Sequence, residues 1–347
     1  MKKCLVLMGI MVFVYACTSS KYFKTNPDKV YSNLNIDENK YFWEQFHEGN
    51  ISNLDSIIKK LEHQLTLDSN DLVANAHLGF AHMWGLSEWQ RIPNVRPNVK
   101  DHAGLAYKYF TKAYDLNPND ARILGFLSDA QMAYGSISGS SKLQRKGYFK
   151  GLKSIKEWPE FNKFTIGVTF SSGKPDSKFF QKALDWQWTT LEDCYTTTID
   201  RTDPKIQSFI NAEYNHKNLG KDRACYNSWI APHNIEGYFL HMGDMITKTG
   251  DYNLAKKIYE LAKASPNFNT WVFKDVLEKR ILNAEKNTTV FLAKNQKGID
   301  NVIINNSGNL CMSCHKMSKE DFSMFKDYNW QDYFKSNDIY AISSDLK

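Results

Sequence analysis

Near the end of this 347-residue chain, two cysteines and a histidine stand in the pentapeptide Cys311-Met312-Ser313-Cys314-His315. Thiols are nucleophiles, redox groups and soft metal ligands, and a neutral imidazole is both a metal ligand and a proton carrier. Two residues separate the thiols, and the imidazole directly follows the second of them. The pattern predicts a site that holds a metal ion, a covalently bound group or a reactive sulfur pair.

The order Cys-x-x-Cys-His is typical of a c-type haem attachment site, and the segment resembles that of c-type cytochromes. The resemblance implies that Cys311 and Cys314 add across the two vinyl groups of one covalent haem c. It also implies that His315 is the proximal ligand of the iron, with electron transfer or redox sensing as the function. Haem is joined to such sites outside the cytoplasm, so this interpretation predicts an exported chain.

Other chemistries remain open for the cysteine pair. A redox dithiol is usually set in a strand–helix thioredoxin pattern, which is not evident around the motif. A zinc site needs further ligands, and Cys194 and Cys225 are distant in the sequence. A structural disulfide or a decayed haem site would make the chain a non-enzymatic scaffold.

The sixth ligand of an iron bound here is not evident. The segment 298–347 is below the usual size of a domain with its own core, so haem would pack partly against the rest of the chain. Met324 is the candidate distal ligand near the motif, whereas Met317 is too close in sequence to reach the opposite face. Other candidates share an imidazole or thioether side chain: Met242, His241, His233 and His216. A five-coordinate iron, as in a peroxidase-like enzyme, is the remaining option.

Two more pairs of side chains have suitable chemistry. Cys194 and Cys225 would form a disulfide in an oxidising compartment and cross-link the middle of the chain, although connectivity does not follow from sequence. His77 and His82 are about one helical turn apart, a spacing that can bind a metal. Packing between helices is the favoured interpretation of these two histidines.

The N-terminus has the order of a secretory signal. Lys2 and Lys3 precede about a dozen apolar residues, too few to span roughly 30 Å of hydrocarbon, and a small residue precedes Cys17. This end resembles the lipobox of bacterial lipoproteins; an ordinary signal peptide is the alternative. The resemblance implies removal of residues 1–16, a lipid on Cys17 and a polar tether over 17–39. We therefore expect an anchor in the outer membrane, facing the periplasm.

Most of the remaining chain is predicted to be all-α, built from repeated helical pairs. In 236–284, Gly243 lies on a first helix and Tyr259 on a second, with a turn at Gly250 between them. This unit resembles a tetratricopeptide repeat, and weaker copies follow the same pattern through 40–160. In that family, small residues let antiparallel helices approach while aromatic residues fill the space between them. We therefore expect a helical-repeat solenoid.

The central stretch 161–235 does not fit this repeat. Apolar and polar residues alternate from Phe164 to Phe170, which is typical of a short strand or extended loop. Phe180 to Cys194 has helical spacing instead. We interpret 161–235 as an irregular insertion with degenerate repeats, and 285–347 as a small haem-binding segment.

Charge and composition limit the possible partners. The formal net charge is +6 and no long block of like charges is present, so nucleic acid is not an expected partner. We expect a membrane contact through the lipid and a periplasmic or membrane protein bound by the repeats. No hydrolase triad, carboxylate pair or phosphate-binding loop predicts another enzyme, and a non-enzymatic role is favoured. The alternative is a scaffold lipoprotein with a structural cysteine pair.

Overall fold

A computed structural model describes residues 33–88, 99–206, 224–225, 234–293 and 310–326. Within these ranges the regular elements are helices, and none is a strand. The helices are α1 (Asn33–Glu48), η2 (Ile51–Asn53), α2 (Leu54–Leu67), α3 (Leu72–Glu88), α4 (Val99–Leu116), α5 (Ala121–Ile137), α6 (Ser141–Glu157), α7 (Pro159–Phe170), α8 (Lys178–Tyr195), α10 (Ile235–Thr249), α11 (Tyr252–Ala262), α12 (Lys274–Leu282), α13 (Ala284–Val290), α14 (Leu310–His315) and α15 (Lys319–Lys326). The predicted all-α fold class is confirmed for this part of the chain.

Several helices begin at a polar residue that accepts hydrogen bonds from the first turn. Asp71 Oδ1 accepts from the backbone N–H groups two and three residues later, at 2.9 and 3.0 Å, at the start of α3. Asp120 accepts from the equivalent N–H groups of α5, and Asp251 from one in α11. These side chains satisfy N–H groups that have no partner inside the helix. They mark where successive helices start.

Consecutive helices pack closely where a glycine faces an aromatic ring. A Cβ on Gly79 of α3 would lie 2.7 Å from Phe110 Cε1 of α4. A Cβ on Gly243 of α10 would lie 2.2 Å from Tyr259 Cε1 of α11. Only glycine leaves room for the ring at these distances.

The expected strand or loop between Phe164 and Phe170 is wrong, because these residues belong to α7. Pro159 occupies the first turn, where its missing N–H has no cost and its fixed φ favours a helix. The helix is buried over much of its circumference, including Phe161, Phe164 and Ile166. A short helix buried on several sides shows no amphipathic period, so its apolar residues can alternate by chance as in a strand. α7 packs against the next helix, α8.

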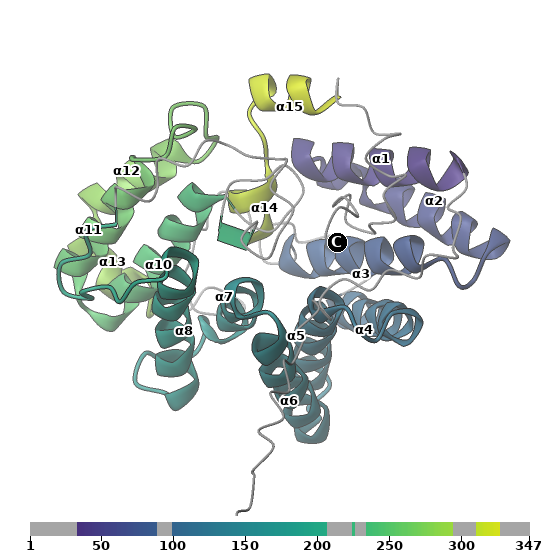
Figure 1. Cartoon of the computed structure of the whole chain (residues 1–347), viewed down its shortest axis with the longest axis horizontal. Helices are drawn as coiled ribbons and strands as arrows, with labels where there is room; N and C mark the ends of the chain where they lie inside the picture. The colour runs from purple at the N-terminus through teal and green to yellow at the C-terminus, as the bar shows by residue number, and fades with distance from the viewer. Residues whose placement is uncertain (1–32, 89–98, 207–223, 226–233, 294–309, 327–347) are drawn as a thin grey trace, which may run out of the picture.

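The helices follow one another in a curved array, and α14 lies between its two ends (Figure 1). α14 contacts α1 and α3 on one side of the array and α10 on the other. Met312 is 3% exposed and belongs to the same hydrophobic cluster as residues of α1, α3 and α10. The cysteine-bearing segment is therefore part of the main core. In the described ranges no helix is both long and apolar enough to cross a membrane.

Candidate functional site

The Cys-x-x-Cys-His pentapeptide forms most of α14, a helix of 6 residues. An isolated helix of this length is not stable in water, because one turn fixes several residues for few hydrogen bonds. Its stability must come from the elements around it. Contacts with α1, α3 and α10 provide this, and they also determine what surrounds each functional side chain.

Side chains from distant parts of the chain cap the last carbonyls of α14. Asn234 Nδ2 donates to Cys314 O at 2.9 Å and approaches Ser313 O at 3.4 Å. Trp271 Nε1 also donates to Ser313 O, at 3.1 Å. The last carbonyls of a helix have no partner within it, so these bonds replace water at a buried helix end.

His47 of α1 holds the end of the motif from the other side. Its Nδ1 lies 2.7 Å from the carbonyl oxygen of His315, and because a carbonyl only accepts, Nδ1 must carry the proton. Its own carbonyl accepts from Met317 N at 2.9 Å. Burial, together with the nearby His315, lowers the pKa of His47 to about 3. His47 is therefore a neutral clamp on the backbone of the motif.

The two motif thiols are partly buried and are not joined in a disulfide. Cys311 Sγ lies 3.9 Å from Ser87 Oγ of α3, and Cys314 Sγ lies against the backbone of α10 at Gly237. Burial raises the pKa of Cys311 to about 11 and that of Cys314 to about 12. A catalytic redox dithiol requires a thiol with a lowered pKa. The surroundings therefore disfavour redox-dithiol chemistry.

The imidazole of His315 lies among aromatic rings of α1. Its centroid is 5.0 Å from the Phe46 ring, 6.5 Å from the Trp43 ring and 5.9 Å from the His47 ring. Burial lowers the pKa of His315 to about 4. The ring is therefore neutral near pH 7, which is the form with a lone pair for a metal.

These residues fit the attachment of haem. Cys311 and Cys314 present two uncharged sulfurs on one short helix, and His315 adds a neutral imidazole. The surroundings are apolar and aromatic, as a porphyrin requires. Trp84 Nε1 is also buried, with no hydrogen-bond partner among the described residues. A buried donor without a partner is unusual and favours a group beyond the polypeptide near this core.

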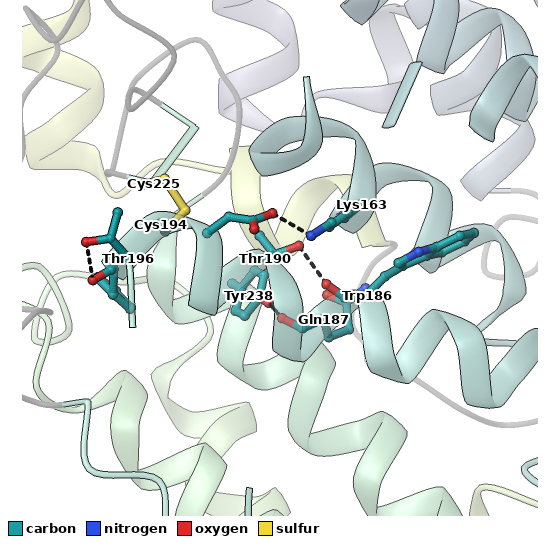
Figure 2. Close-up of a disulfide and its surroundings, with 10 residues drawn as sticks. Lys163, Trp186, Gln187, Thr190, Cys194, Thr196, Cys225 and Tyr238 are labelled. Carbon is teal, nitrogen blue, oxygen red and sulfur yellow. Dashed lines mark hydrogen bonds and ion pairs between the residues drawn. A yellow bond between two sulfur atoms is a disulfide. The ribbon is translucent and has the colours of Figure 1, made fainter. Parts of the chain in front are cut away.

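Cys194 and Cys225 form a disulfide at the C-terminal end of α8, with Cα atoms 5.4 Å apart (Figure 2). The same helix is joined to α10, because the Tyr238 hydroxyl donates to Gln187 O. α10 in turn contributes Asn234 to the capping of α14 through the residue before its first turn. The disulfide therefore fixes a segment next to the helix that supports the motif.

A small cavity lies beside the disulfide. It has a volume of about 30 Å³ and is lined in part by Cys194, Cys225 and Tyr238. Ligand pockets usually measure roughly 300–1,000 Å³. This cavity can hold a water molecule or two but no organic ligand.

The histidine pair considered as a metal site is not brought together. His77 stacks on Phe42 with centroids 4.4 Å apart. His82 instead faces α4, with Nδ1 3.0 Å from His102 Nδ1. Among the described residues no group of three or more potential metal-ligating side chains was found. His77 instead packs among the Phe42 and Trp43 rings of α1.

Some predicted residues cannot be placed. Met324 is on α15, but its side chain lies outside the described part. Cys17, His216 and His233 also lie outside the described residues. The lipid anchor and these three candidate ligands therefore remain predictions.

Sequence reasoning missed the residues that hold the motif in place: His47, Asn234 and Trp271. His47 is 268 positions from its partner, and no local spacing links the two. Asn234 had a weak signal, as a polar residue directly before an apolar helix, but this predicts only an N-cap. The contacts of His47, Asn234 and Trp271 with the motif depend on where α14 packs in the fold.

Comparison of the chain with protein-family models, with curated proteins and with solved structures finds no match.

Proposed function

We propose that this chain is an exported c-type cytochrome, with one covalent haem c on Cys311, Cys314 and His315. A tetratricopeptide-like helical scaffold carries the haem. One observation carries the proposal: α14 presents two uncharged thiols and a neutral imidazole from within an aromatic core. Its role is electron transfer or redox sensing rather than hydrolysis or group transfer.

Each thiol has a simple part in attachment. Its sulfur would bond to one carbon of a haem vinyl group and its hydrogen would pass to the other carbon, so attachment would consume no oxidant. Once bound, the haem contributes one-electron redox chemistry at iron. His315 would hold the iron through its lone pair, and His47 keeps the His315 backbone in place through the 2.7 Å hydrogen bond.

The Gly79–Phe110 and Gly243–Tyr259 contacts support the repeat assignment, because they place small and aromatic residues as tetratricopeptide pairs do. The scaffold also offers a surface for a periplasmic or membrane protein. α6 presents a basic face, whose exposed cations are Lys142, Arg145, Lys146, Lys153 and Lys156. An acidic partner would be guided to this face, with an association rate that falls as salt increases.

The proposed location is the cell envelope, with the lipid on Cys17 holding the chain to the outer membrane. The Cys194–Cys225 disulfide supports an oxidising compartment, since such bonds are rare in the cytosol. Cys17→Ser should release the protein from the membrane fraction. Continued palmitate labelling of this variant would contradict the anchor.

The haem assignment is tested by expressing the full chain in a host with cytochrome maturation enzymes. We expect a band that stains for haem after denaturing electrophoresis and a mass increase of one haem. The stain should be lost in the double variant Cys311→Ala/Cys314→Ala and retained in Cys194→Ser. A colourless wild-type protein with the mass of its lipidated polypeptide would leave the alternative, a scaffold lipoprotein.

A further inference from the structure

The imidazole of His241, on α10, is buried without a hydrogen-bond partner. The side chain is 0% exposed, and neither Nδ1 nor Nε2 has a partner among the described residues. A neutral imidazole always carries one N–H and one lone pair. Burying such groups unpaired costs about 1–3 kcal/mol each, so native proteins rarely do it without a functional reason.

His241 lies close to the point where haem would be attached. It follows Gly237 by four residues, so the two share a face of α10 and are about 6 Å apart along its axis. A Cβ on Gly237 would be 2.6 Å from Cys314 Sγ, which shows how closely this face approaches the motif. Figure 1 shows α10 beside α14, and α7 next to α10. Phe164 of α7 packs edge-on against His241, with centroids 5.6 Å apart.

The proximal histidine is on the other side of α14. His315 packs against Phe46 and Trp43 of α1, whereas Cys314 packs against α10. A porphyrin that is held at Cys314 and ligated from the α1 side has its second face available to another element. α10 is the described helix that meets α14 opposite α1 and α3, and it carries an unpartnered imidazole.

We propose that His241 is the second axial ligand of the haem iron, opposite His315; this inference rests on the proposed haem attachment. Bis-histidine ligation would use the lone pair of one of the two buried His241 nitrogens and leave no open position on the iron. The protein would then transfer electrons through the haem edge, without binding peroxide or oxygen.

Other described histidines are less suitable. His47 Nδ1 is engaged with the motif carbonyl, and His82 is paired with His102. His77 is also 0% exposed with both nitrogens unpartnered, but it packs against Trp43 on the same side as His315, with centroids 5.4 Å apart. His77 is therefore a matched control: it is as buried as His241, but it lies on the His315 side of the proposed haem.

The test uses the full-length holoprotein and its optical and electron paramagnetic resonance spectra. We expect a low-spin wild type whose ferrous form binds carbon monoxide poorly. His241→Ala should become high-spin and bind carbon monoxide at least tenfold more readily, and added imidazole should restore the low-spin spectrum. His77→Ala should keep the wild-type spectrum.

The outcomes distinguish failure of the His241 assignment from failure of the proposed haem attachment. A wild type without covalent haem refutes the proposed function itself. Covalent haem that is high-spin in the wild type, or low-spin in His241→Ala without imidazole, overturns the role of His241 and leaves the cytochrome in place. If His241→Ala does not accumulate, His241→Met is used instead; an unchanged spectrum in that variant has the same meaning, because methionine ligation would shift it.

Discussion

Gly237→Ala directly tests how the motif helix is held. In most helix positions this substitution stabilises, by up to about 1 kcal/mol. Here the new methyl group would lie 2.6 Å from Cys314 Sγ and 2.7 Å from the backbone oxygen of Ser313. Favourable contacts between such atoms need roughly 3.5–4.0 Å. α14 would have to shift by about 1 Å relative to α10, which would strain the hydrogen bond that the Trp271 indole donates to Ser313 O.

Overpacking of this kind costs typically about 1–3 kcal/mol. A net loss of about 2 kcal/mol would increase the population with α14 undocked by roughly 30-fold. In haem-free protein this population can be measured by alkylation of Cys311 and Cys314. Burial raises the pKa of both thiols, so the docked form contains little reactive thiolate and modification proceeds mainly through opening. We expect alkylation about 30-fold faster than in the wild type.

Gly104→Ala in α4 is the matched control. Its methyl group would lie 3.2 Å from Tyr134 Cε2, on a partly exposed ring that can shift. Its alkylation rate should therefore equal that of the wild type. If Gly237→Ala also reacts at the wild-type rate, α14 is not packed on α10 and the description of the site is incorrect.

Gly243→Ala would bring a methyl group to 2.2 Å from the fully buried Tyr259 ring. We therefore expect the free energy of unfolding, measured in urea, to fall by about 2 kcal/mol. A urea midpoint equal to that of the wild type would contradict the packing of α10 on α11. Burial raises the pKa of Asp129 to about 8, so the folded protein retains a proton that the unfolded chain releases. The contribution of protonated Asp129 to the free energy of unfolding is complete below about pH 4. It decreases by up to about 1.4 kcal/mol per pH unit as the pH rises towards 8. Asp129→Asn should remove this pH dependence. If the free energy of unfolding changes with pH in the same way in the variant and the wild type, Asp129 is not its source. Cys194→Ser removes a disulfide that joins residues 31 positions apart. It should lower the free energy of unfolding by roughly 2–4 kcal/mol, which thermal denaturation can measure. An unchanged melting temperature would show that the disulfide does not constrain the unfolded chain.

The all-α class was predictable because helix formation depends on neighbouring residues. Asp71 and Asp120 act in this local way, since their carboxylates reach N–H groups only two and three residues away, although the sequence pattern alone did not identify them as helix starts. Gly243 and Tyr259 pair because both belong to one hairpin with a short turn. The strand expected at 164–170 failed because alternation over so few residues does not distinguish a strand from a helix buried on several sides.

The chemistry of the motif is local: the order of two thiols and an imidazole within five residues is already complete in the sequence. What surrounds that chemistry is not local. The neutral state of His315, the raised pKa values of the thiols, the caps from His47 and Trp271 and the unpartnered ring of His241 all depend on burial between α1, α3 and α10. Burial and capping are made by residues as many as 268 positions apart. Only the packing of the helices brings such residues together, because desolvation and hydrogen bonding depend on distance in space and not on distance along the chain.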